Sequence, residues 1–328
     1  MNNFCTLFDS SYLTRGLALY SSLEEHCEEF HIFIFAFDDS SYSYLKNANL
    51  ERATIISLEE FEDEDLLGVK NSRTRAEYCW TCTPSIILYS ITQFNLESCT
   101  YLDADLYFFS SVERVFEEFA GNSILLTEHR YSEINIQEKI RGKYCVQFMT
   151  FLSNNNGMEA LNWWRDRCIE WCFSRYEEGK FGDQLYLDDW LKRFKSVYVL
   201  QNEGAGVAPW NMESYNFSLQ DNCTFLTKKT DNKSMELVFF HYHHLELFTN
   251  NKIVLSYYKT DKNLREFVYK PYIMKLLEIE DKVLTSSTYQ KDDLRKTEEP
   301  RSLIGMIRKL KHFYNGTLNE FNTLNFLK

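Results

Sequence analysis

Residues 31–37 read His-Ile-Phe-Ile-Phe-Ala-Phe, and no other segment constrains the fold as strongly. An apolar run without polar alternation is typical of a strand that is covered on both faces, as the strands of parallel sheets are. Helical patterns begin near Tyr12, with apolar residues at 3–4 spacing, and at Arg75. Strands that alternate with helices predict an α/β fold with a mostly parallel sheet flanked by helices. Three more apolar runs predict strands at residues 4–8, 53–58 and 100–102.

The rest of the chain continues this pattern and then becomes helical. A polar stretch at residues 286–300 resembles a linker, and a basic helical pattern follows it. Further strands are expected at residues 123–127, 145–152 and 237–240, and helices at residues 158–176, 183–194 and 263–284.

The charge and the glycine content exclude several functions. Lys plus Arg is 36 and Asp plus Glu is 48, so the formal net charge is −12. A field of this sign repels nucleic acid, and we expect no nucleic-acid partner. Only 11 of the 328 residues are glycine, and neither GxGxxG nor GxxxxGK(S/T) occurs. Dinucleotide-binding and P-loop chemistry are therefore disfavoured.

The cysteines and the apolar segments bear on the compartment. No stretch approaches the roughly 18 apolar residues of a membrane span, and residues 1–9 lack the basic and apolar regions of a signal peptide. Cys79 and Cys82 have redox-motif spacing but fall within a helical pattern. We therefore expect all nine cysteines to be reduced, buried thiols and the location to be cytoplasmic.

Two carboxylates two residues apart, Asp103 and Asp105, follow the strand at 100–102 and precede another apolar run. Burying such a pair at a sheet edge is costly without a cation. A hard divalent metal with open positions for phosphate oxygens would explain it. The alternative is a pair of solvated turn or capping carboxylates.

Two later motifs carry chemistry-bearing side chains. His241, His243 and His244 follow the strand at 237–240, and imidazole is a ligand for Mn²⁺ and other transition ions; packed or surface histidines are the alternative. Asp183 and Gln184 follow a glycine at the start of a helical pattern, which could equally be helix capping.

The order of these motifs resembles that of the GT-A fold nucleotide-sugar glycosyltransferases, most closely the glycosyltransferase family 8-like retaining enzymes. The resemblance covers about residues 3–260. It rests on a strand followed by Asp-x-x-Tyr, an Arg in a following helix, Leu-Asp-Ala-Asp at 102–105, Gly-Asp-Gln at 182–184, Ala-Pro-Trp-Asn at 208–211 and Phe-His-Tyr-His at 240–243.

The resemblance implies a role for each matching residue. Asp103 and Asp105 would bind Mn²⁺ (or Mg²⁺) and the donor diphosphate, with His241 as a further metal ligand. Asp183 and Gln184 would lie at the acceptor side of the reaction centre, with Gln184 near the anomeric carbon. The donor nucleotide, a UDP-sugar by this resemblance, would contact Phe8, Asp9, Ser11, Tyr12, Asp103 and Arg75, or Arg73 in place of Arg75.

Two departures from the family pattern stand out. His244 replaces a Gly, and no Lys-Pro-Trp follows it, so the diphosphate would be met by Lys252, Lys259 or His243 instead. Val-Gln-Phe at 146–148 stands where Asn-x-Gly is common, which predicts a different acceptor pocket.

The expected activity is transfer of a hexose from a nucleotide diphosphate sugar to a hydroxyl of a glycan or glycolipid in surface polysaccharide synthesis. Two alternatives remain at this point: a catalytically inactive GT-A module that binds glycan or scaffolds partners at a membrane, and a sugar-phosphate nucleotidyltransferase. The expected organisation is a GT-A catalytic domain at 1–260, a helical extension and linker at 261–300, and a basic amphipathic tail at 301–328.

The sequence of the tail predicts a contact outside the substrate site. Residues 301–313 combine Arg301, Arg308, Lys309 and Lys311 with apolar residues at helical spacing. Such a helix can lie in a membrane interface. This predicts a peripheral contact with the inner face of a membrane and a lipid-linked glycan acceptor, or else a helix packed on the catalytic domain.

Overall fold

The computed structural model describes residues 1–133, 137–298 and 303–328, with the backbone alone at 303–308. Its centre is a seven-stranded sheet in the order β3-β2-β1-β4-β7-β6-β8. Only β7 runs against the others in this sheet. The strands are β1 (Asn2–Phe8), β2 (Phe30–Ala36), β3 (Ala53–Ser57), β4 (Ser98–Leu102), β6 (Ile124–Glu128), β7 (Tyr144–Leu152) and β8 (Val197–Val199).

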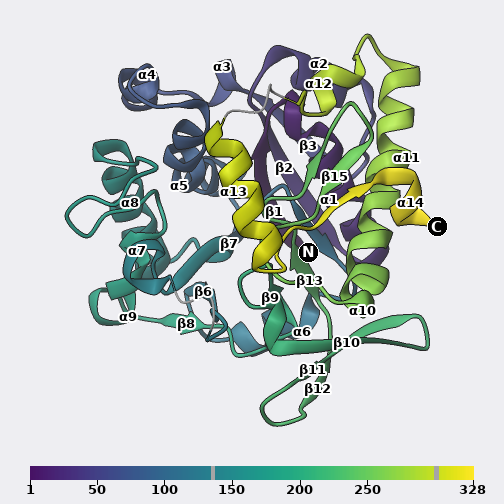
Figure 1. Ribbon diagram of the computed structural model, residues 1–328. Coiled ribbons are helices and arrows are strands. Elements are labelled where there is room, and N and C mark those ends of the chain that lie inside the picture. The colour runs from purple at the N-terminus through teal and green to yellow at the C-terminus, as the bar shows by residue number, and fades with distance from the viewer. Residues whose placement is uncertain (134–136, 299–302) are drawn as a thin grey trace.

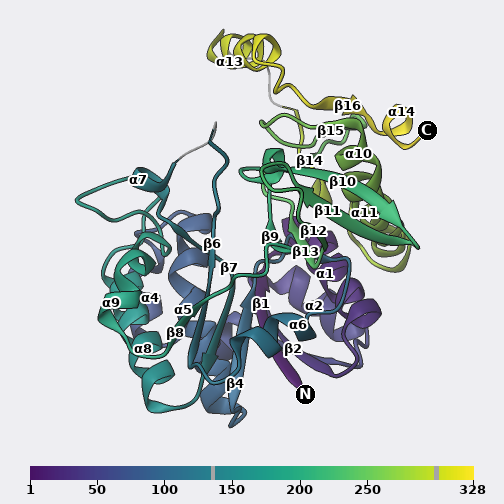
Figure 2. The ribbon, with the colours of Figure 1, turned by 90° about the horizontal axis from the view of Figure 1, so that it is seen from below.

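Helices cover both faces of the sheet, as Figure 2 shows. On β2, Ile32 and Ile34 enter one core while Phe33 and Phe35 enter the other. The apolar run at 31–37 is thus covered on both sides, as its lack of alternation predicts. One core is packed by α1 (Leu13–His26) and α11 (Lys270–Ser286), the other by α5 (Arg75–Gln93) and α8 (Asn155–Glu170).

Polar side chains cap the starts of the helices. Asp38 follows β2 and caps α2 (Asp39–Asn47) by accepting from the Ser41 amide. Thr74 and Glu77 form a capping box that starts α5 at Arg75. The other short α-helices before residue 194 are α3 (Leu58–Phe61), α4 (Glu64–Lys70), α6 (Glu113–Phe119), α7 (Glu138–Arg141) and α9 (Trp190–Arg193).

A second sheet, of three strands, contains the first residue of the histidine motif, His241. In it β13 (Phe239–His241) lies between β5 (Leu106–Phe108) and β9 (Ala205–Val207). The antiparallel register pairs His241 with Leu106, directly after Asp105. An antiparallel meander of β10 (Tyr215–Gln220), β11 (Cys223–Lys228) and β12 (Ser234–Glu236) projects beside it (Figure 1).

The C-terminal part of the chain returns to the domain. β16 (Glu320–Asn322) pairs with β15 (Lys252–Val254), which also pairs with β14 (Glu246–Leu247). The polar stretch at 286–300 contains α12 (Lys291–Leu294) and a buried ion pair of 2.7 Å between Arg295 and Glu280. Other elements are α10 (Lys262–Leu264), a π-helical turn at Arg265–Tyr269, α13 (Leu303–Tyr314) and α14 (Thr323–Leu327). The domain boundaries at 260 and 300 stay predictions.

The nine cysteines are all free thiols, but Cys79 and Cys223 are partly exposed rather than buried. The helix expected at 183–194 is a 3-10 turn at Leu185–Asp189 followed by the short α9. Among the described residues, no helix combines the length and the apolar character needed to cross a membrane.

Candidate metal centre

Asp103, Asp105 and His241 meet at the edge of the sheet where the parallel strands end. The two aspartates lie in the turn between β4 and β5, which closes with a 3.1 Å bond from the Leu106 amide to the Asp103 carbonyl. His241 Nε2 is 3.0 Å from Asp105 Oδ1 and 3.6 Å from Asp103 Oδ2. One ligand atom of each residue lies within 4.8 Å of the others. The structure thus brings together the three residues that the sequence predicted to share a metal, although they come from two different sheets.

The electrostatics of this cluster fit a divalent ion. Burial would raise the pKa of Asp105, but the charge and hydrogen bond of His241, together with the charges of His243 and Arg15, lower the pKa to about 2. Burial would lower the pKa of His241, but Asp105 raises it well above its usual value. A proton on His241 thus neutralises carboxylates whose burial would otherwise be costly. Two carboxylates and an imidazole are also a ligand set that suits Mn²⁺ or Mg²⁺.

The neighbours of Asp103 hold it in place. The Tyr101 hydroxyl donates to Asp103 Oδ1 at 2.8 Å, and the Asp103 amide donates to the Gln147 carbonyl at 3.0 Å. Burial raises the pKa of Asp103 above its ordinary value, although His241 opposes the shift. The sequence pattern placed Gln147 only in the segment that predicts a different acceptor pocket, and it did not assign Tyr101, which lies in an apolar strand.

Apart from Asp103, the predicted nucleotide residues lie at the end of β1 and at the start of α5. Asp9 accepts from the amide and hydroxyl of Ser11 at 2.8 and 2.5 Å. Arg75 Nε lies 2.6 Å from Asp9 Oδ2, and Arg75 Nη2 lies 2.8 Å from Asp38 Oδ2. Phe8 is in the core, where its ring fills the space beside the Cα of Gly16. The side chains open to a ligand here are therefore those of Arg75, Ser11 and Tyr12.

Two arginines take roles that the sequence left open or missed. Arg73 donates to the Ile169 carbonyl at 3.1 Å and stacks 3.8 Å above the Phe173 ring, away from Asp9. Arg75 is therefore the arginine that contacts the predicted nucleotide residues. Arg15 is buried, lies 4.6 Å from the centre of the Tyr12 ring, and its charge acts on Asp105. A helical arginine one turn after a strand end was the only sequence signal for it.

Asp183 and Gln184 point in different directions. Asp183 is buried, and its carbonyl accepts from the Trp164 indole at 2.9 Å. Burial, followed by the charge of Asp103, raises the pKa of Asp183 to about 8, so this carboxyl belongs to the same electrostatic cluster. Gln184 is partly exposed, and its Nε2 donates to the Arg141 carbonyl at 2.6 Å. It therefore ties the turn after Asp183 to the C-terminal end of α7.

Aromatic rings surround the histidine motif. The Trp210 ring lies 5.3 Å from the His241 ring at 88° and 5.6 Å from the His243 ring. His244 has a φ of 66°, so it occupies the left-handed conformation that the Gly of the resembled family would adopt easily. Lys252 forms a 2.5 Å ion pair with Glu298. Among the expected diphosphate partners, His243 lies beside the ring of His241, whereas the amide of Lys259 donates to Glu213.

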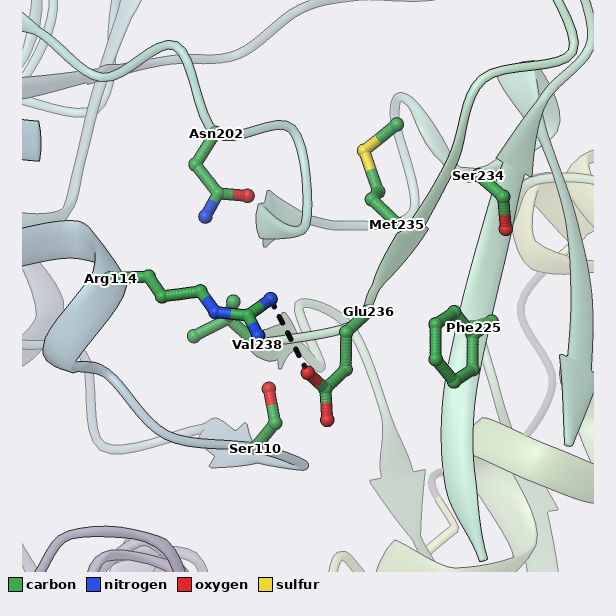
Figure 3. A pocket seen from close by; sticks show the side chains of 8 residues that line it. All are labelled: Ser110, Arg114, Asn202, Phe225, Ser234, Met235, Glu236 and Val238. Carbon is green, nitrogen blue, oxygen red and sulfur yellow. Dashed lines mark ion pairs between the residues drawn. The ribbon is translucent and has the colours of Figure 1, made fainter. Parts of the chain in front are cut away.

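A cavity of about 330 Å³ lies elsewhere, between α6 and the meander (Figure 3). Arg114 and Glu236 face each other in it at 3.6 Å. It contains none of the predicted site residues, so the candidate site rests on the side chains that meet at the sheet edge. The cavity is lined by Ser110, Arg114, Asn202, Phe225, Ser234, Met235, Glu236 and Val238.

The described residues form the α/β fold that the GT-A resemblance predicted, with a mostly parallel central sheet flanked by helices. The structure is similar to that of the galactosyltransferase LgtC solved with donor and acceptor sugar analogs, with a TM-score of 0.51 and 10% identity over 89% of this chain and 98% of that one. No family model matches the chain.

Two relatives place the chain in a family. It is 31% identical over 280 residues to the uncharacterized protein YfnD of Bacillus subtilis (strain 168), covering 84% of this chain and 88% of that one. It is 30% identical over 278 residues to the uncharacterized protein YfnF of the same organism, covering 82% and 89%. The chain belongs to the family of these two proteins.

Proposed function

We propose that the protein is a metal-dependent glycosyltransferase that moves a hexose from a nucleotide diphosphate sugar, a UDP-sugar, to a hydroxyl of a glycan or glycolipid. The observation that carries this proposal is the meeting of Asp103, Asp105 and His241 beside the Asp9–Arg75 cluster. Ligands of α/β sheets bind where the parallel strands end. A metal centre next to polar strand ends at this edge suits a donor that has both a diphosphate and a nucleoside.

The residues of the site divide the chemistry between them. Asp103, Asp105 and His241 would hold Mn²⁺ or Mg²⁺, which supplies positive charge to the departing diphosphate. Arg75 and Ser11 contact Asp9 at the strand ends and would help to orient the nucleoside. Gln184 would stabilise positive charge that develops on the sugar, since its Oε1 is not used by the bond to Arg141.

The state of Asp183 supports the retaining route of family 8-like enzymes. An inverting enzyme needs a carboxylate base for the acceptor hydroxyl. With a pKa of about 8, Asp183 carries a proton at neutral pH in the metal-free protein, and burial is the larger cause of the shift. Asp183 is then a hydrogen-bond donor that orients the sugar, and the leaving phosphate accepts the proton of the acceptor hydroxyl.

Incubation of the protein with Mn²⁺ and a panel of nucleotide sugars tests the proposal. Slow hydrolysis that releases UDP from one of the sugars, and that EDTA abolishes, is the expected result. Release of pyrophosphate from a nucleoside triphosphate and a sugar phosphate would identify a nucleotidyltransferase instead. Absence of any turnover, with UDP still bound, would point to a glycan-binding or scaffolding module.

We further propose that α13 contacts an anionic membrane surface, at the inner face of the membrane, where a lipid-linked acceptor in surface polysaccharide synthesis would be found. Leu310, Phe313 and Tyr314 on this helix are 55%, 66% and 83% exposed. Exposed apolar side chains next to lysines are typical of interfacial helices. Arg301 and the side chains of Leu303, Ile304, Ile307 and Arg308, which the sequence pattern also used, lie outside the described part of the structure.

A further inference from the structure

We propose that Gln147 is a positioning residue for the metal centre, an inference that rests on the metal-dependent function proposed above. Gln147 lies on the antiparallel strand β7 and is fully buried. It interrupts an otherwise mostly apolar strand at the point closest to the aspartate turn.

Gln147 contacts two of the three candidate ligands through different atoms. Its backbone carbonyl accepts from the Asp103 amide at 3.0 Å. Its side-chain Oε1 lies 2.7 Å from His241 Nδ1. One residue of the central sheet thus fixes both the aspartate turn and the imidazole that arrives from the small sheet.

The hydrogen bond to Nδ1 determines which nitrogen of His241 can bind a metal. When Oε1 accepts a hydrogen bond from the Nδ1–H group, the lone pair of the neutral imidazole is on Nε2, the atom that faces Asp103 and Asp105. Outer partners of metal-binding histidines commonly act in this way. An amide turned by 180° would donate to Nδ1 and would leave the proton on Nε2, where it blocks metal binding.

The surroundings of the amide nitrogen indicate that the acceptor Oε1 explains why a glutamine occupies this position. Gln147 Nε2 is buried and has no hydrogen-bond partner among the described residues. An unpartnered amide inside a protein costs stability, and methionine would fill the same space without that cost. The space for Nε2 comes from Gly206, which has a φ of 91° and whose Cβ would lie 3.1 Å from Nε2. The fold therefore accommodates a costly group that only its acceptor atom explains.

Titration of the full-length protein with Mn²⁺ alone, followed by the electron paramagnetic resonance signal of free Mn²⁺, measures the effect. Gln147→Met keeps the volume and removes the acceptor, and Mn²⁺ should bind about 10–100-fold more weakly. Gln147→Glu keeps an acceptor and cannot donate, so it should bind Mn²⁺ at least as tightly as the wild type. Thr150→Val is the matched control: Thr150 lies on the same strand as Gln147, and the substitution removes its buried hydrogen bond to Thr100 on β4 but should not change Mn²⁺ affinity.

Thermal unfolding in EDTA shows whether each variant folds. If Gln147→Met does not fold, Gln147→Asn, which retracts the acceptor by one methylene, should show the same loss of affinity. Unchanged Mn²⁺ affinity in the folded Met or Asn variant overturns the inference, as does an equal loss in Met and Glu. If the wild type binds no Mn²⁺, the metal-dependent function itself fails and this inference with it, so the two failures are distinguishable.

Discussion

Arg75 lies 2.6 Å from Asp9 and 2.8 Å from Asp38, and thereby joins the ends of two neighbouring parallel strands. Both acids are also tied to serines at these strand ends, since Ser11 donates to Asp9 and Ser10 to Asp38. The side chain of Arg75 is nevertheless 60% exposed. A ligand that reaches this edge therefore meets a cation whose position two carboxylates already determine.

Arg75→Met should weaken UDP binding more than it weakens the fold. Exposed ion pairs stabilise proteins by about 1 kcal/mol or less, whereas loss of the cation removes a contact to the nucleoside and leaves the charges of Asp9 and Asp38 uncompensated beside the anionic UDP. Calorimetric titration with UDP and Mn²⁺ measures the affinity. Arg73→Met is the control, because Arg73 stacks on Phe173 and should leave UDP affinity unchanged. Equal losses in the two variants would count against Arg75 as a nucleotide contact.

Asp105→Ala should abolish the thermal stabilisation that Mn²⁺ and UDP together confer. A ligand at 100 times its dissociation constant stabilises the native state by about 2.7 kcal/mol, and this increment should disappear because a metal ligand is lost. Differential scanning fluorimetry with and without Mn²⁺/UDP provides the comparison. Asp166→Ala, at an exposed position on α8, should keep the full shift. A full shift in Asp105→Ala as well would remove Asp105 from the site.

Asp183 should make the metal-free protein less stable as the pH rises from about 4 to 8. Its pKa of about 8 in the folded protein exceeds the unfolded value near 3.9, so the folded state binds the proton more tightly throughout this window. Each pH unit costs up to about 1.4 kcal/mol of the free energy of unfolding. Asp183→Asn cannot ionise and should gain stability relative to the wild type from pH 5 to pH 8. Urea unfolding in EDTA measures this, and a pH-independent difference would refute the raised pKa.

Gln184→Ala should lower turnover by about a hundredfold while leaving the dissociation constant of UDP nearly unchanged. One electrostatic contact that forms in the transition state contributes about 3 kcal/mol. Such a contact lowers kcat rather than raising KM. Steady-state donor hydrolysis separates the two constants, with the exposed Gln201→Ala as control. A rise in KM at constant kcat would place Gln184 in ground-state binding.

Replacement of Leu310, Phe313 and Tyr314 by serine should remove sedimentation with phosphatidylglycerol vesicles and leave donor hydrolysis intact. The substitutions are preferable to truncation after residue 300, because truncation would also remove β16 from its pairing with β15. Binding should weaken with salt, since each Lys or Arg near an anionic surface contributes about 1 kcal/mol. Leu219→Ser, exposed on β10, is the matched control. Indifference of the wild type to vesicles at low salt would return α13 to a structural role.

Local patterns were sufficient to predict six of the seven strands of the main sheet, and they missed the three-residue edge strand β8. The apolar run at 31–37 corresponds to β2, and the helix expected from Arg75 begins there because Thr74 and Glu77 cap it. The small sheets were less predictable. β5 has only three residues, and its pairing with β13 depends on contacts more than 130 positions apart, which no local period reveals.

The candidate site was predictable where a motif marks a strand end. Asp103, Asp105 and His241 were paired through a motif order, and the structure brings them together. Arg15 was missed, and Gln147 was noted only in the segment of the acceptor pocket, because buried polar residues on a helix or strand look like exceptions in a core pattern. Their roles depend on partners that lie far away in the sequence, such as Leu245 for Arg15 and His241 for Gln147.

The indole of Trp210 lies next to the ring of His241, so its fluorescence can report whether the metal centre is occupied. Paramagnetic Mn²⁺ quenches the fluorescence of a nearby indole, whereas diamagnetic Mg²⁺ does not. Of the six tryptophans in the chain, Trp210 is in ring contact with a candidate metal ligand. Emission should therefore fall on addition of Mn²⁺, recover on chelation, and lose this response in Trp210→Phe. Occupancy of the metal centre can then be followed in real time without a label, a substrate or knowledge of the acceptor.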